Sequence, residues 1–167
     1  MYDTTLDAFC IISMYNTQLA LLPTDTPAYV DRPYTAQGTD YMWIDITTVG
    51  TLITNDDWFH EGNSWASDDG YFVLSLPFVF PYWQTAETSL HIGTNGYVTM
   101  GPGHYAFGNS LPIPTPGGSI ADVELDGSIA LLWADLDPSS AATEAGAGVY
   151  YFANSDMAVV SYSAIPY

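Results

Sequence analysis

Apolar and polar residues alternate over several short stretches of this chain, and no stretch keeps the 3.6-residue apolar spacing of an amphipathic helix. Residues 71–76 predict one strand. Residues 89–100 predict a hairpin, because Asn95 and Gly96 at its centre supply the positive φ angles that a tight turn needs. Residues 148–152 and 157–162 predict a second hairpin. Many short strands without helices predict an all-β fold, which we interpret as an antiparallel β-sandwich.

Weaker strand signals occur before and between these hairpins. Residues 41–46 and 51–54 predict two short strands, and Pro77 is expected to end or bend the strand that begins at Tyr71. Residues 129–133 form an apolar run of the length of a buried core strand. Residues 101–118 form a loop rich in glycine and proline, long enough to be a contact surface. We assign residues 39–167 to the sandwich domain.

Residues 1–38 differ from the rest of the chain. An apolar, strand-like run covers residues 8–15 and a second covers residues 18–22, after which Pro23, Pro27 and Pro33 predict an extended connector. A single apolar strand on a proline-rich linker has nothing to pack against locally. We therefore interpret residues 1–38 as an extended N-terminal arm, which either folds back onto its own domain or pairs with a neighbouring molecule.

The charge of the chain excludes several classes of partner. There are 19 acidic residues and one basic residue, Arg32, which gives a formal charge of −18. Such a surface repels phosphate backbones, so we expect no nucleic-acid binding. No run of about 20 apolar residues is present, so we expect no membrane insertion. The chain has no lysine, and Arg32 is followed by Pro33, so trypsin-like proteases find almost no cleavage site. Such resistance suits a protein exposed outside cells.

Four segments occur in an order that resembles nidogen-like (NIDO-type) extracellular β-sandwich modules. They are residues 68–70 (DDG), 76–83 (LPFVFPYW), 92–101 (IGTNGYVTMG), and 129–138 (IALLWADLDP) followed by 148–151 (GVYY). The resemblance covers residues 68–165. It implies an adhesion or matrix module at the cell surface or outside the cell, with no catalytic residues to carry over.

Modules of that kind continue with two further strands beyond the position of residues 161–163, whereas this chain ends at Tyr167. The resemblance therefore implies a sandwich that lacks a strand, while the N-terminal arm holds a strand without a sheet. We predict that the arm of one subunit inserts into the sandwich of the next, forming a homopolymer or filament of copies of this chain. The alternatives are that residues 8–22 form the first strand of their own sandwich, or that they are disordered.

The predicted interface residues lie in the first apolar run of the arm. Two sets alternate along it, and the set with Cys10, Ile12 and Met14 is the more uniformly apolar. Cys10 is the only cysteine, so it forms no internal disulfide and fits a small buried apolar residue. The complete predicted interface is Phe9, Cys10, Ile11, Ile12, Ser13, Met14 and Tyr15.

Signals for an enzyme are weak. His60, His91 and His104 are scattered, and no spacing typical of a zinc site, nucleophile elbow or phosphate loop occurs. Paired carboxylates are expected by chance in so acidic a chain, so they do not by themselves indicate a glycoside hydrolase. We predict that the chain is not an enzyme.

Two kinds of ligand remain open. Asp135 and Asp137 present two carboxylates from one strand end and predict a calcium site, with a second acidic group at Asp56, Asp57, Asp68 and Asp69. The main alternative function is an adhesion or carbohydrate-binding module, with or without calcium. Exposed aromatic residues would then stack on glycans, and the candidates are Trp58, Trp65, Trp83 and Tyr105.

Overall fold

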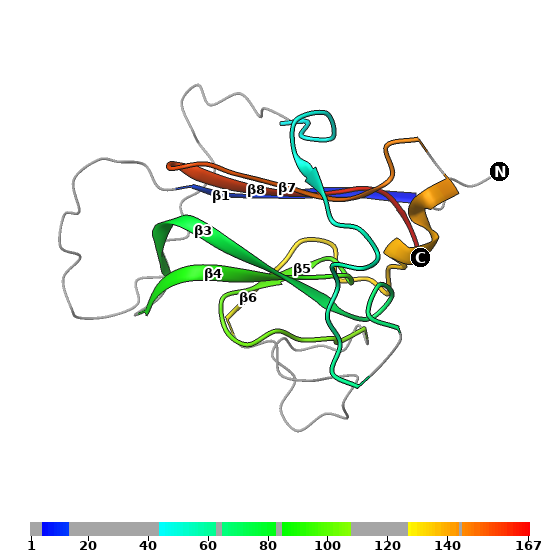
Figure 1. The fold of residues 1–167 in the computed structure, drawn as a ribbon, viewed down its shortest axis with the longest axis horizontal. Helices are drawn as coiled ribbons and strands as arrows, with labels where there is room; N and C mark the ends of the chain where they lie inside the picture. The colour runs from blue at the N-terminus through cyan, green and yellow to red at the C-terminus, as the bar shows by residue number, and fades with distance from the viewer. Residues whose placement is uncertain (1–4, 14–43, 63–64, 83–84, 108–126, 144) are drawn as a thin grey trace, which may run out of the picture.

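The protein is mostly β-structure, arranged as two antiparallel four-stranded sheets that lie as two layers in Figure 1. The computed structural model describes residues 5–13, 44–62, 65–82, 85–107, 127–143 and 145–167. The first sheet has the strand order β1-β8-β7-β2, and the second has the order β3-β4-β5-β6. The strands are β1 (Thr5–Ser13), β2 (Thr51–Leu52), β3 (Tyr71–Tyr82), β4 (Thr85–Gly93), β5 (Tyr97–Thr99), β6 (Ser128–Ala130), β7 (Gly148–Ala153) and β8 (Met157–Pro166).

Strand β3 shows how alternation in the sequence builds the core. Leu74 and Leu76 are buried, whereas Val73 and Ser75, which alternate with them, are exposed, as the two-residue period of a strand requires. Pro77 bends the strand without ending it, because the pairing of β3 with β4 is regular up to Ser75 and resumes at Phe80 after an irregular segment. The predicted strand at residues 71–76 is thus confirmed and extends to Tyr82.

Both predicted hairpins are confirmed, but the first has a different turn. Gly93 pairs with Tyr97, so the loop between β4 and β5 contains three residues, 94–96. Only Gly96 has a positive φ, of 75°. A three-residue loop with glycine in the left-handed region replaces the two-residue turn that we predicted. Asn95 is therefore free to turn its side chain into the protein, where it is almost fully buried.

The predicted core strand at residues 129–133 is wrong beyond Ala130. Strand β6 ends there, and the backbone N–H groups of Leu131, Leu132 and Trp133 all point at the Gly96 carbonyl oxygen, at N–O distances of 2.9, 3.1 and 3.3 Å. Trp133 has a φ of 46°, which shows how sharply the chain curls at this point. The three N–H groups thus bond to one carbonyl at the tip of the β4–β5 hairpin and not to a neighbouring strand, so β6 is shorter than the apolar run predicted.

One hydrophobic core joins the two sheets. It contains Leu74, Leu90 and Ile92 from the second sheet and Val160 and Tyr162 from the first. The Tyr162 hydroxyl donates to the carbonyl of Gly93 and lies 3.2 Å from the carbonyl oxygen of Tyr97, so it ties the first sheet to the second. Burial of this shared apolar surface holds the layers together.

The outer face of the first sheet has a cover of its own. Ile44 and Ile46 pack against Tyr150 and Val159 on the side of the sheet away from the main core. Residues 44–46 form no strand, in contrast to our prediction for 41–46, and residues 41–43 lie outside the described part of the chain. The apolar residues of this segment, which suggested a strand, serve to cover the sheet as part of a loop.

The remaining predicted elements are shorter than expected or of another kind. The strand expected at residues 51–54 is reduced to β2, and Ile53 then turns into the core. A short 3₁₀ helix, Pro138–Thr143, precedes β7, and the Asp137 carboxylate caps its start. In the ranges that the structure covers, no helix has the length and apolar character needed to cross a membrane.

Candidate functional site

Strand β1, which contains most of the predicted interface, lies at an edge of the first sheet and pairs with β8 along nearly its whole length. The register places Cys10 opposite Val160 and Ile12 opposite Ala158. Both partners are core residues with almost no exposed surface. In antiparallel pairs, directly opposite residues share a face, so Cys10 and Ile12 occupy core-side positions of the register.

The rest of the predicted interface follows from the same ladder. Phe9, Ile11 and Ser13 are opposite Ser161, Val159 and Met157, on the other parity. Met14 and Tyr15 lie outside the described residues. Between Ser13 and Ile44, only residues 14–43 connect β1 to the remainder of the chain, and this length spans roughly 100 Å at full extension. In this structure of a single chain, β1 pairs with β8 of its own chain, which is the arrangement that we gave as the alternative for residues 8–22. The connection through residues 14–43 is long enough for β1 to reach the same place on a neighbouring chain instead.

Acidic residues that are far apart in sequence gather at the end of the molecule where β4 and β5 meet. The carboxylate of Asp68 has Asp69, Asp135 and Asp137 near enough for their charges to affect it. The structure therefore brings the predicted pair Asp135 and Asp137 together with one half of the second acidic group. The other half is elsewhere: Asp56 is exposed, and Asp57 accepts hydrogen bonds from the backbone N–H and hydroxyl of Thr54.

Asn95 holds this acidic region together, and sequence reasoning missed its role. Its amide nitrogen donates to the Asp69 carboxylate at 2.9 Å and to the Ala106 carbonyl at 3.1 Å. Its amide oxygen accepts the backbone N–H of Leu136 at 2.7 Å. One buried side chain thus joins the loop before β3, the loop after β5 and the segment that carries Asp135 and Asp137. From the sequence, Asn95 is explained fully by its place in a turn, so nothing in the pattern indicated that its side chain makes tertiary contacts.

The carboxylates of the acidic region have shifted pKa values. Partial removal from water, together with the charges of Asp137, Asp69 and Asp135, raises the pKa of Asp68 to about 6. Burial also raises the pKa of Asp69, against the hydrogen bond from Asn95. For Asp137, burial acts in the same upward direction, but the hydrogen bonds from Ser139 and Ser140 outweigh it and lower the pKa. Asp137 is thus a capping residue already satisfied by hydroxyl groups.

We expect Asp68→Asn to stabilise the protein at pH 8. A carboxyl whose folded pKa lies above its unfolded value near 4 stabilises the fold fully below about pH 4 and loses that contribution as the pH rises through 6. Because Asp68 is only partly buried, solvent screening reduces the effect to about 1 kcal/mol at pH 8. Urea unfolding between pH 4 and 8 measures it. The exposed Asp56→Asn is the matched control, and equal effects of the two changes would show that the local cluster is not responsible.

The described residues contain no group of three or more histidine, cysteine or acidic side chains placed to hold a metal ion. Asp135 and Asp137 therefore remain a predicted calcium pair without a demonstrated third carboxylate ligand among these residues. Backbone carbonyls also coordinate calcium, and the chemistry of the donors is of the right kind.

The aromatic residues predicted to form a glycan platform are dispersed. Trp58 is only 6% exposed and belongs to the core, so it is excluded as a candidate for an exposed platform. Trp65 is 62% exposed, Tyr105 stacks on His60 with ring centroids 4.2 Å apart, and Trp83 lies outside the described residues. Phe59, which we did not single out, is 52% exposed and meets Tyr71 edge to face. Its neighbour Trp58 takes the buried position, which alternation along an extended segment explains.

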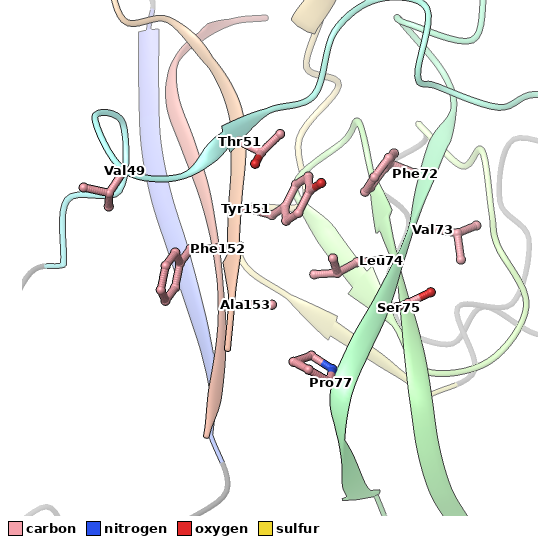
Figure 2. Close-up of a pocket in the computed structure, with 10 residues that line it drawn as sticks. All are labelled: Val49, Thr51, Phe72, Val73, Leu74, Ser75, Pro77, Tyr151, Phe152 and Ala153. Carbon is pink, nitrogen blue, oxygen red and sulfur yellow. The ribbon is translucent and has the colours of Figure 1, made fainter. Parts of the chain in front are cut away.

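A groove with a volume of about 510 Å³ lies between the open edges of the two sheets. Figure 2 shows its walls: Tyr151 and Ala153 of β7 lie opposite Leu74 and Pro77 of β3, whereas the side chain of Phe152 points away from β3. The loop before β2 closes one end with Val49 and Thr51. No predicted site residue lines this groove. It could not be recognised from the sequence, because it arises from the shortness of β2.

Comparison of the chain with protein-family models, with curated proteins and with solved structures returns no match in any of the three.

Proposed function

We propose that this chain is a structural subunit of an extracellular homopolymer. In the proposal the two sheets form a β-sandwich, and residues 1–38 form the arm that joins neighbouring subunits. Strand β1 of one subunit pairs with β8 of the next, in the register described above. The proposed partners are copies of the same chain, and the proposed location is the cell surface or the space outside the cell.

The position of β1 carries this proposal. It is an edge strand whose only strand partner in the described residues is β8, and it is joined to the body through residues 14–43. Exchange of such a strand replaces a set of main-chain hydrogen bonds within one chain by the same set between chains, so its enthalpic cost is small. The contact is head-to-tail, and a head-to-tail contact that does not close into a ring generates a filament.

The distribution of charge supports the same proposal. Each subunit has a formal charge of −18, so two copies repel each other wherever their acidic surfaces meet. Residues 8–24, by contrast, contain no charged side chain. Of β1, only Asp7 carries a charge, and the part from Ala8 to Ser13 enters a neighbour without bringing a like charge. The absence of lysine, which leaves trypsin-like proteases few sites, suits a durable material.

Electron microscopy tests the proposal. We expect the purified chain to form filaments, and a variant that lacks residues 1–22 to stay monomeric, because it has no strand to donate. A matched control adds the missing segment back as a synthetic peptide, which should bind the truncated chain in a one-to-one complex. Monomers from both the full and the truncated chain would count against a polymer.

Calcium is a secondary part of the proposal. Asp135 lies in the acidic region with Asp68 and Asp69, and a divalent ion there would relieve the repulsion that raises the pKa of Asp68. A rise in melting temperature with calcium, lost in Asp135→Asn, supports an ion in this region. Equal responses of the two proteins assign the effect to general screening of charge.

Glycan binding is the second candidate function. The observation in its favour is the exposure of Trp65 and Phe59, since large aromatic rings in water are suited to stacking on sugars. It ranks second because the buried Trp58 leaves a smaller platform than the sequence suggested. A glycan screen of the wild type beside Trp65→Ala distinguishes this function from the polymer.

A further inference from the structure

The groove between β3 and β7 exists because both strands have open edges. Strand β2 covers only Tyr150 and Tyr151 of β7, so Phe152 and Ala153 have no strand beside them on that edge among the described residues. Across the groove, β3 is the edge strand of the second sheet, and within the described part of the chain only Tyr71 forms a bridge on its outer edge, with Phe59. Open strand edges present unpaired N–H and C=O groups, which readily accept another extended segment.

The lining of the groove restricts what it can bind. None of its ten lining residues is charged, although the chain as a whole carries a formal charge of −18. Leu74 and Pro77 of β3 face Tyr151 and Ala153 across it in Figure 2. An uncharged, apolar, extended peptide of a few residues fits these walls and these edges.

The arm contains such a peptide at the right distance from β1. Residues 18–22 (QLALL) are uncharged and mostly apolar. Strand β1 ends at Ser13, opposite Met157, at the same end of the sheet as Ala153, which pairs with Ala158. Ser13 is thus separated from β7 by two inter-strand spacings, or about 10 Å. Residues 14–17 bridge up to roughly 16 Å, which is sufficient.

The direction of the chain also fits. Strand β1 is antiparallel to β8, and β8 is antiparallel to β7, so β1 and β7 run in the same direction. A chain that leaves β1 and turns back around the end of the β7–β8 hairpin therefore runs antiparallel to β7. Strand β2 is also antiparallel to β7. Residues 18–22 would occupy the open part of the same edge that β2 begins to fill.

We propose that residues 18–22 dock in the groove between β3 and β7, as an added strand beside Phe152 and Ala153. The arm then holds its acceptor at two places, with β1 on the β8 edge and the leucines in the groove at the opposite edge. Leu19 and Leu21 lie two residues apart, so they project to the same side and enter the groove together. This inference does not depend on strand exchange, because the segment follows β1 whether β1 belongs to the same chain or to a neighbour.

Cross-linking between engineered cysteines tests the docking in the full chain. The background is Cys10→Ser, which removes the native thiol. Leu21→Cys is combined with Ala153→Cys in the groove or with Ala86→Cys, a control site on β4 that is exposed and outside the groove. Each pair is treated with a short bis-maleimide, and near-ultraviolet circular dichroism confirms that each variant is folded. Thr51→Cys at the rim replaces Ala153→Cys if the latter does not fold.

We expect the groove pair to cross-link at least tenfold faster than the control pair. Equal rates would overturn the docking, because they would mean that residues 18–22 visit the two sites indifferently. The size of the cross-linked product reports separately on the polymer: a product of monomer size places β1 and the groove in one chain, and a dimer or larger places them in neighbouring chains. Docking and strand exchange therefore fail independently in this experiment.

Discussion

Ile12→Asp is expected to abolish polymer formation. Ile12 pairs with Ala158, which belongs to the core shared by the two sheets, so an aspartate would occupy a core-side position of the register. Burying an unpaired carboxylate costs far more than one edge strand contributes, and the strand is released. The product should be a soluble monomer whose free energy of unfolding is lower by about 3 kcal/mol, because the edge of β8 is left open.

Sedimentation and urea unfolding measure the two effects of this substitution. Ile12→Val is the matched control, since it keeps an apolar side chain of similar shape and should cost only about 1 kcal/mol without loss of assembly. If the aspartate variant still polymerised like the wild type, β1 would not be the strand that joins the subunits.

The largest effect on stability is expected from Asn95→Ala. The side-chain amide of Asn95 accepts a hydrogen bond from the Leu136 N–H and donates one to the Ala106 carbonyl, and both of these residues are fully buried. Alanine leaves both backbone groups without a partner and also releases Asp69. An unsatisfied buried group costs about 1–3 kcal/mol, so the loss in the free energy of unfolding is expected to be about 4 kcal/mol.

The control for Asn95→Ala lies in the other hairpin. Asn154 caps the β7–β8 turn by accepting two backbone N–H groups, from Asp156 and Met157, and most of this turn is open to water. Because water replaces the lost partners, Asn154→Ala should cost about 1 kcal/mol. Chemical denaturation of both variants at pH 7 compares them. Similar losses would contradict the view that Asn95 is a tertiary anchor rather than a turn residue.

The parts of the fold that the sequence predicted are those governed by local rules. Alternation identified β3, and glycine or asparagine between two apolar runs identified both hairpins. The errors occurred where a distant group competed with the local pattern. The carbonyl of Gly96 accepts hydrogen bonds from three successive N–H groups, so β6 ends at Ala130 although the apolar run continues to Trp133. Likewise, Ile44 and Ile46 cover a sheet instead of forming a strand.

The candidate site was predicted only in part, for a similar reason. Asp135 and Asp137 were recognisable as a pair because only Leu136 separates them along one segment. Their proximity to Asp68 depends on tertiary contacts that no spacing encodes, among them the hydrogen bonds of Asn95. The register of β1 was equally inaccessible, since either parity of residues 9–14 is apolar enough to face a core. Pairing with Val160 and Ala158 decides between the two parities.

The most direct test of strand exchange uses the native thiol of Cys10. Its register partner is Val160, so Val160→Cys places a second thiol directly across the ladder, where a disulfide bond forms readily. The purified variant is oxidised under assembly conditions and separated on a denaturing, non-reducing gel. Strand exchange predicts a ladder of covalent multimers that is converted to monomer on reduction. A single monomer band with an internal disulfide would show that β1 pairs with β8 of its own chain, and would contradict the polymer.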